Sequence, residues 1–308
     1  MFFLHFFIKN FKRTKKVRSL TIESILNNVD ELPELPQIAM QVMKIVNNPE
    51  SNVTDLSNVV SKDQSLTAKV LRLCNSAFYG VSRHITTVTD AVGILGFNTI
   101  KSLVLLATTY NTVQKGLVGY GLKQGELWEH SINTAQTSRY LATRIQSKNN
   151  IVLPIKDPEE AFIAGLLHDI GKIILNQHAL AEIYRAMNLS VLKGIPFHIA
   201  EQQIIGFDHA MVGAALAEKW NFPSLLVDAI KLHHESENLS GDKIFAAIIV
   251  LANILSFIAQ KGPNDQNIRL IPMNSLTVLD ISDLELTGIV KEIMQDIDKI
   301  GELLTAMT

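Results

Sequence analysis

The sequence predicts an all-α fold, and three observations support this prediction. Apolar residues recur at spacings of three and four along most of the chain, so that Ile38, Val42 and Ile45 share one face of a helix. Alternation of apolar and polar residues over the length of a strand is scarce. Proline and glycine residues separate the periodic segments, as is typical of boundaries between helices. We therefore expect a bundle of many helices with short connections.

The composition is that of a globular protein with a large core. Of the 308 residues, 47% are hydrophobic, which is enough for one large domain or two moderate ones. Only 19% are charged and the net charge is -2, so the composition excludes a disordered charged chain and gives no reason to expect a nucleic-acid partner. The single cysteine, Cys74, cannot form an internal disulfide and is expected in the core, which fits a reducing, cytoplasmic location.

Local signals set the expected helix ends in the first third of the chain. Pro36 suits the first turn of a helix, and either Asn52 or Thr54 can cap the next one. Thr89 and Asn98 are expected to cap two later helices. The pattern predicts helices over 22–29, 36–48, 55–61, 64–76, 90–95 and 99–110.

A glycine-rich stretch at 114–125 indicates a flexible crossing, and we place an internal boundary there. Beyond it, the pattern predicts helices over 125–147, 157–175, 178–188, 196–205, 208–220, 223–234, 242–261 and 285–306. Residues 262–284 are expected to form an exposed loop with a short extended piece at 276–281.

The first 19 residues form an apolar and basic tail. Its apolar run is far too short to span a bilayer, which takes about 20 residues. Two interpretations remain open: a loosely packed tail, or an interfacial helix over residues 1–18 that makes weak contact with a membrane surface. In the second case the headgroup contacts would come from Lys9, Lys12, Arg13, Lys15 and Lys16.

Histidines and carboxylates recur in a pattern that could hold a metal. Their nitrogen and oxygen atoms suit iron, manganese or zinc. His168 and Asp169 lie in an apolar stretch, where charged groups are costly unless they are paired or bound to metal. The candidates are Glu126 with His130, His168 with Asp169, His209, and His233 with His234.

These candidates also have simpler interpretations. Glu126 and His130, four residues apart, would form a helix-stabilising pair. The remaining histidines are expected at the surface or as satisfied core groups; they are His5, His84, His178 and His198.

Several segments together resemble one known family. They are LPELPQIAMQVMKIVNN, LRLCNSAFYG, AVGILGFNTIKS, LWEHSINTA, AGLLHDIGK, FDHAMVGAALAEKW and IKLHHE. In this order they resemble HDOD domains, the HD-related output domains of bacterial signalling proteins. The resemblance implies an HD-like helical bundle over 20–261, with an N-terminal helical part at 20–113 and an HD-like part at 122–261. Residues 262–308 would then be a C-terminal loop and helix extension.

HDOD domains are similar to HD-type metal-dependent phosphohydrolases, including the HD-GYP enzymes that cleave cyclic dinucleotides. By position, this resemblance implies a site for one or two divalent metal ions. It also places Lys172 where the relatives have a lysine that reaches a substrate phosphate. In two respects the chain differs: Asn253 stands where the enzymes have a last aspartate, and the GYP segment after the HHE motif is absent. The implied metal-ligand positions are Glu126, His130, His168, Asp169, His209, His233, His234 and Asn253.

Two functions therefore compete. Because many HDOD domains are regarded as non-catalytic, the resemblance favours a regulatory output module that binds a protein partner, with any metal in a structural role. The alternative is a metal-dependent phosphohydrolase that acts on a phosphate-containing ligand. In that case Asp169 would bridge two ions and Lys172 would offset the phosphate charge.

Overall fold

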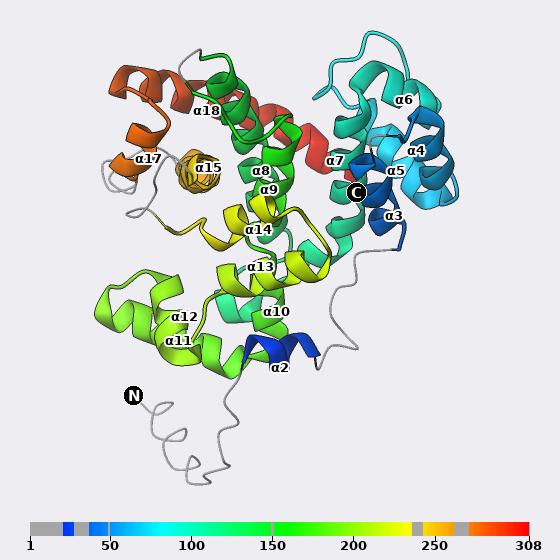
Figure 1. Cartoon of the computed structure of the whole chain (residues 1–308). Helices are drawn as coiled ribbons and strands as arrows, with labels where there is room; N and C mark the ends of the chain where they lie inside the picture. Colours follow the sequence, from blue (N-terminus) through cyan, green and yellow to red (C-terminus); the bar gives the residue numbers. More distant parts are fainter. Residues whose placement is uncertain are drawn as a thin grey trace.

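The computed structural model describes residues 21–27, 37–48, 50–148, 151–235, 243–261 and 271–307. Within these ranges the chain forms helices and no β-strand, which confirms the all-α prediction. Figure 1 shows a group of helices early in the chain on one side, a central bundle, and further helices below and above that bundle. The apolar tail falls outside the described residues.

The early helices pack around α7 (Phe97–Val113), whose middle turns are buried. The others in this group are α3 (Gln37–Asn47), α4 (Val53–Val60), α5 (Gln64–Cys74) and α6 (Val88–Leu95). Asn52 caps α4, because its side chain accepts hydrogen bonds from two backbone amides while Asp55 bonds back to the amide of Asn52. Cys74 is buried at the end of α5, as expected.

Two expected caps in this region are wrong. Thr87, not Thr89, caps α6, since its hydroxyl accepts from the backbone amide of Asp90. Asn98 lies inside the first turn of α7, which follows Gly96 without a side-chain cap. The side-chain amide of Asn98 instead donates to the Asp157 carboxylate at 2.7 Å. This hydrogen bond connects α7 to the segment before α9.

The central bundle consists of α8 (Glu126–Gln146), α9 (Glu159–Leu167) and α15 (Ile244–Lys261). After a first turn that carries Glu159 and Glu160, α9 is apolar on all sides, as is typical of a helix that other helices surround. Gly165 allows α9 to lie close to α8, since a Cβ there would meet the Ser138 hydroxyl oxygen at 2.6 Å and the Ala135 Cα at 2.8 Å.

Below the bundle in Figure 1, the chain forms a second layer of shorter helices. They are η1 (Val118–Tyr120), α10 (Ile170–His178), α11 (Leu180–Lys193), α12 (Phe197–Ile205), α13 (His209–Lys219) and α14 (Ser224–Lys231). Helix α10 packs on α13, α13 on α14, and α11 on α12. The short α2 (Ile22–Asn27) contacts α13 and buries Ile25.

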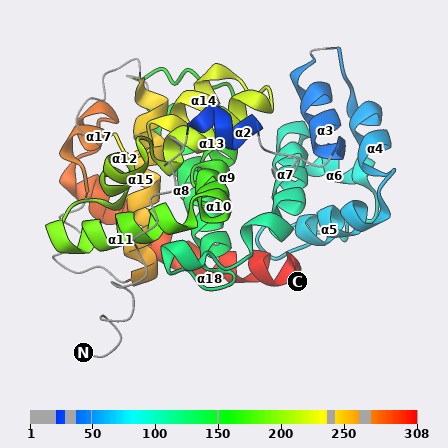
Figure 2. The same ribbon diagram turned by 90° about the horizontal axis from the view of Figure 1, so that it is seen from below.

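The last part of the chain differs from the expected loop. Residues 276–281 do not form an extended piece, because α17 (Met273–Val278) begins after Pro272 and buries Leu276. Helix α18 (Asp283–Met307) then runs from α15 past α8 to α5, as Figure 2 shows. It buries Ile289 and Ile293, so it is the expected amphipathic packing helix.

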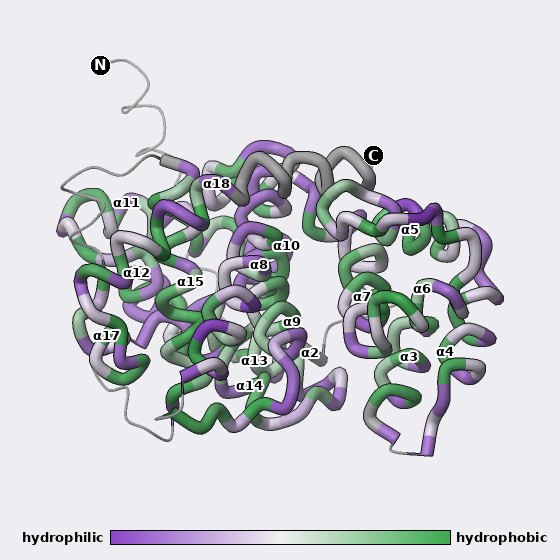
Figure 3. The backbone as a smooth tube through the Cα atoms, turned by 90° about the horizontal axis from the view of Figure 1, so that it is seen from above, coloured by the Kyte–Doolittle hydropathy of each residue, from purple (hydrophilic) through white to green (hydrophobic). Residues whose placement is uncertain are grey.

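Figure 3 colours the backbone by the hydropathy of each residue, and hydrophobic and hydrophilic stretches alternate along outer helices such as α11. This pattern is typical of helices that have one face in the core and one in water. None of the described helices is both long enough and apolar enough to cross a bilayer.

Candidate metal centre

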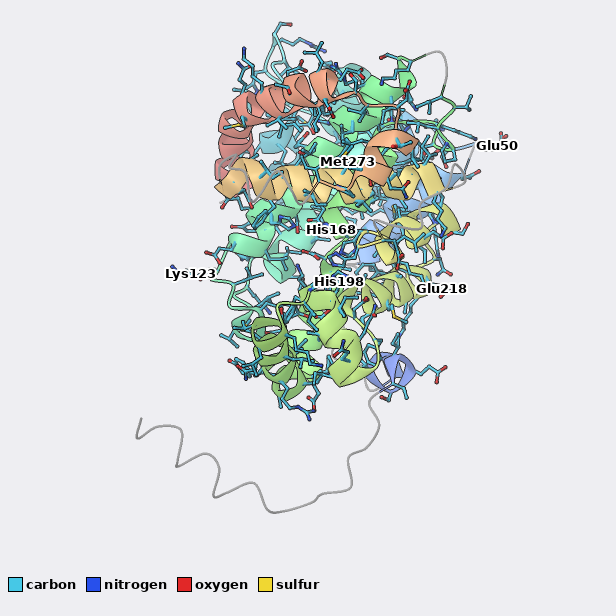
Figure 4. All side chains as sticks on the ribbon, turned by 90° about the vertical axis from the view of Figure 1, so that its left-hand side faces the viewer. Glu50, Lys123, His168, His198, Glu218 and Met273 are labelled. Atoms are coloured by element: carbon cyan, nitrogen blue, oxygen red, sulfur yellow. The ribbon has the colours of Figure 1, made fainter. Side chains whose placement is uncertain are left out.

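The candidate site is built where the expected helix 157–175 breaks. His168 ends α9 in helical conformation, whereas Asp169 has φ -98° and ψ 8° and α10 begins only at Ile170. Adjacent residues on one straight helix would diverge by about 100°. Because the chain turns here, both side chains reach the same point. Figure 4 shows His168 in the interior of the molecule.

The carboxylate of Asp169 lies at the centre of the site and is 1% exposed as a residue. Its Oδ2 lies 3.5 Å from Nε2 of His130 and 3.4 Å from Nε2 of His168. Its Oδ1 lies 3.3 Å from Nε2 of His209 and 3.6 Å from Nε2 of His233. One carboxylate therefore contacts imidazoles from four separate segments of the chain.

These side chains form two groups, and both groups contain Asp169. Within each group, all the potential ligand atoms lie within 4.8 Å of one another. The first is His130, His168 and Asp169; the second is Asp169, His209, His233 and His234. His234 joins the second group through a contact of 2.8 Å between its Nε2 and Nε2 of His209.

Three of the imidazoles are held in one orientation by their outer nitrogen. Nδ1 of His168 donates to the carbonyl oxygen of Gly165 at 2.7 Å, and Nδ1 of His233 donates to that of Ile230 at 2.6 Å. Nδ1 of His209 bonds to the Glu201 carboxylate at 2.6 Å. Because carbonyl and carboxylate oxygens accept, Nδ1 carries the hydrogen and Nε2 is directed at the centre. This is the usual arrangement of metal-binding histidines.

Glu201 is a functional residue that the sequence did not indicate. It lies in the polar sequence EQQ on α12, yet it is fully buried. Its carboxylate also accepts from the Tyr120 hydroxyl at 2.6 Å and from the backbone amide of His209 at 3.1 Å. A buried carboxylate with three donors holds His209 firmly in place.

The protonation of the site follows from burial and charge. Burial, together with the neighbouring His168, lowers the pKa of His130 to about 3, and burial lowers the pKa of His233 to about 4. Burial alone would also lower the pKa of His209, but the charge of Glu201 outweighs it and raises that pKa to about 9. Near pH 7, His130 and His233 are therefore neutral, whereas His209 is protonated on both ring nitrogens and carries a positive charge.

The donor set fits a divalent cation. Asp169 Oδ1 and His233 Nε2 are both buried and have no hydrogen-bond partner. Two such unpaired atoms in a dry site are costly unless a cation lies between them. Cationic neighbours flank the carboxylate, because the Lys172 ammonium lies 2.5 Å from Oδ2 and the protonated His209 ring lies 3.3 Å from Oδ1, but neither of them gives His233 Nε2 a partner. Imidazole nitrogens with a carboxylate suit zinc, iron or manganese.

Of the other expected ligands, Glu126 lies away from the centre, and Asn253 lies on α15. Glu126 is exposed at the start of α8 and its carboxylate accepts from the backbone amide of Lys123 at 2.8 Å, so it is outside both groups. Asn253 is half-buried on α15, and its role as a ligand stays a prediction.

His198, which was expected to be an ordinary surface or core residue, lies half-buried beside the centre. Its ring stacks on that of His234, with 4.3 Å between centroids and 6° between planes. Figure 4 shows it near His168, towards α11 and α12. A cavity of about 260 Å³ opens beside the centre at this place. Its lining includes Tyr120, Lys172, Phe197, His198, His209 and His234.

Residues 32–236 match the model of the HDOD domain. The chain belongs to the HDOD family. This result confirms the family that the sequence resembles. The division of the HDOD domain near residues 113–122 stays a prediction.

Solved structures share the HDOD architecture over nearly the whole chain. A protein of Shewanella amazonensis SB2B named "Putative phosphohydrolase" is 28% identical, with a TM-score of 0.72 over 92% of this chain and 98% of the other. An HDOD domain protein of unknown function from Geobacter sulfurreducens is 26% identical, with a TM-score of 0.71 over 93% and 95% of the two chains.

Curated relatives are longer than this HDOD chain. An uncharacterized protein of Treponema pallidum is 24% identical over 79% of this chain but only 46% of its own length. Ribonuclease Y of Mycoplasma mycoides is 29% identical over 52% of this chain and 30% of its own length. The chain thus spans less than half the length of either relative.

Proposed function

We propose that this HDOD protein binds divalent metal and hydrolyses a phosphoester at the Asp169 centre. The observation that supports the proposal is the position of the Asp169 carboxylate between two groups of histidines, which is the ligand arrangement of a paired-metal site. Cation, phosphate and water would meet there beside a cavity of about 260 Å³.

Each residue of the centre has a role that its contacts suit. Asp169, with the five histidines of the two groups, would hold the metal. When bound, divalent ions at such a centre polarise a phosphoryl oxygen and lower the pKa of water towards neutrality. The Lys172 ammonium lies at the cavity wall and would bind a phosphate oxygen as a point charge. The rings of Tyr120 and Phe197 would pack on the organic part of the ester.

Two relatives support phosphoester chemistry by their names. The Shewanella protein, named as a phosphohydrolase, matches this chain over nearly its full length. Ribonuclease Y is named for cleaving RNA, which is also phosphoester chemistry, but the match covers only 30% of that protein. The shared part supports the proposed reaction class and leaves the substrate open.

A second candidate function is a signalling output module in which the metal is structural and a partner protein binds the helical surface. The amide of Asn253 favours it, because related enzymes have an aspartate at the corresponding position. An amide is a weaker ligand than a carboxylate and carries no charge to bridge two ions. This candidate needs no turnover, and any metal at Asp169 would be structural.

The two candidates separate in one experiment. Elemental analysis of the purified protein measures bound metal, and hydrolysis of bis-p-nitrophenyl phosphate with added Mn²⁺ or Fe²⁺ measures turnover. We expect metal and turnover in the natural protein, and loss of both in Asp169→Asn. The matched control is Asp228→Asn, at an exposed aspartate on α14, which should change neither. Metal without turnover would favour the signalling module, and absence of both metal and turnover would contradict the proposed hydrolase.

A further inference from the structure

A second cavity lies far from the metal centre, between the loop after α5, the C-terminal half of α8, and α18. We name it the Arg144 cavity; its volume is about 520 Å³, within the roughly 300–1,000 Å³ of small-molecule sites. Arg144 follows His130 by fourteen residues on α8, which corresponds to roughly 21 Å. Figure 2 shows α18 passing over this end of α8 towards α5. The lining includes Phe78, Gln136, Arg139, Tyr140, Arg144 and Ile293.

One wall of the Arg144 cavity holds an unpaired buried donor. Gln136 is 8% exposed, and its Oε1 accepts from the Arg139 guanidinium at 2.5 Å, but its Nε2 has no hydrogen-bond partner. Arg139 itself is matched by the buried Glu159 carboxylate at 2.9 Å. A buried amide nitrogen without an acceptor is costly, so an acceptor from outside the chain would stabilise it.

The charge of Arg144 is only loosely matched. Its guanidinium lies 3.9 Å from the Glu292 carboxylate and 3.3 Å from the Tyr140 hydroxyl, and Glu292 is half-exposed. Surface pairs of this length contribute little. The guanidinium therefore keeps free N–H groups for a second acceptor, on the same helix as the unpaired Gln136 amide and within the same cavity.

The lining also has two apolar side chains, Phe78 and Ile293, beside the hydroxyl groups of Thr137, Tyr140, Thr143 and Ser147. Phe78 lies half-buried in the loop after α5 and Ile293 is buried on α18, so they come from two different parts of the fold. The Arg139 guanidinium lies 5.3 Å from the centre of the Phe78 ring and fixes that ring in place. A flat ligand could pack on this ring while its polar end reaches the donors.

We propose that the Arg144 cavity binds a small organic anion with a planar apolar body. Its carboxylate or phosphate accepts hydrogen bonds from Arg144 and Gln136, and its body packs between Phe78 and Ile293. Arginine suits both anions because its guanidinium offers two parallel donors. Since the lining comes from the early helices, from α8 and from α18, the bound anion ties these three parts together.

Two probes test the proposal and distinguish the two anions. Isothermal titration of the full chain with 1-naphthoate and with 5′-AMP should give saturable binding of at least one of them. Preference for naphthoate would assign a carboxylate ligand, and preference for 5′-AMP a phosphate ligand. No saturable binding of either at millimolar concentration would overturn the proposal.

Variants tie the binding to this cavity. Arg144→Gln should weaken binding at least tenfold with an unchanged melting temperature. Gln136→Leu should weaken binding by a similar factor, although it also removes the hydrogen bond from Arg139. The matched control is Arg185→Gln, at an arginine on α11 that pairs with Glu182 and lies outside the cavity. Binding that survives both cavity substitutions, or that falls equally in the control, would also overturn the proposal.

Discussion

At the scale of single residues, the buried Glu201 links the cavity wall to the metal centre. Its carboxylate bonds to the Tyr120 hydroxyl on one side and to Nδ1 of His209 on the other. Such outer partners orient metal-binding histidines and raise their basicity. The strength of metal binding should therefore depend on a residue that touches no metal.

We expect Glu201→Gln to weaken metal binding by about 10–100-fold, the usual effect of removing such a partner. The amide keeps the size of the side chain but removes the charge beside His209. Competition with a chelator of known affinity measures the change. Glu182→Gln on α11 is the matched control and should bind metal normally. Equal affinity in the natural protein and Glu201→Gln would contradict the role given to Glu201.

The proton on His209 predicts a pH dependence of metal binding. Because the pKa of His209 is raised to about 9, a metal ion that binds its Nε2 below that pH must displace a proton. The binding constant should therefore rise by about tenfold per pH unit up to pH 9 and then level off. Titration at pH 7.5 in buffers of different ionisation enthalpy should show about one proton released per ion. Absence of proton release would mean that His209 is not a ligand.

The sequence predicted most of the residues at the centre, and the reason is physical. His168 and Asp169 were recognisable because charged groups in an apolar stretch need a partner. Glu201 was not, since two glutamines follow it on α12 and only its contacts with Tyr120 on η1 and His209 on α13 show that it belongs to the site. Glu126 shows the converse: its spacing placed it on the face of His130, but its carboxylate bonds to the backbone amide of Lys123, which precedes the helix.

At the scale of elements, the contact between α10 and α13 sets the position of His209 relative to Asp169. A Cβ on Gly171 would meet the carbonyl oxygen of His209 at 2.0 Å and the backbone nitrogen of Gly213 at 2.7 Å. Both neighbours are backbone atoms, so no side chain can move aside. The helices can approach this closely only because residue 171 is glycine.

Gly171→Ala should therefore lower the free energy of unfolding by at least about 1–3 kcal/mol, the usual cost of an overpacked core. It should also weaken metal binding, because α13 must shift away from Asp169. Gly93→Ala on α6 is the control, since a Cβ there meets nothing within 4 Å. That change should raise stability by about 0.5–1 kcal/mol. Urea denaturation measures both, and equal stability of the two variants would contradict the packing argument.

The helical periodicity of the sequence predicted the existence of most helices correctly, but it predicted their ends less well. The break between α9 and α10 was missed because the apolar pattern of 157–175 continues through His168 and Asp169. Residues 276–281 contain β-branched residues and were expected to be extended, yet burial of Leu276 against α15 makes this region helical. Tertiary packing overrode local preference there.

At the scale of the whole molecule, α18 connects parts that are far apart in the sequence. It contacts α15 and α8 in the central bundle and α5 among the early helices. Tyr140 on α8 hydrogen-bonds to Glu292 on α18, and Lys148 forms a pair with Glu285 at 3.1 Å. Apolar burial should nevertheless dominate its docking, because exposed ion pairs contribute little.

We expect Ile289→Ala to cost about 2–5 kcal/mol, the usual range for truncating a fully buried aliphatic side chain. Leu284→Ala on the same helix is the matched control, because Leu284 is 84% exposed and its truncation should change stability by less than about 0.5 kcal/mol. Thermal melts of both variants measure the difference. Similar melts would show that α18 adds little to the stability of the fold.

The shared carboxylate of Asp169 has a consequence for how the centre would fill with ions. A single anion between the two histidine groups cannot give its full charge to two cations at once, so occupancy of one group must lower the affinity of the other. Metal titration should then show two separated steps, with a working state that depends on the metal concentration in the cell. The number of ions bound at the centre would then respond to the concentration of free metal.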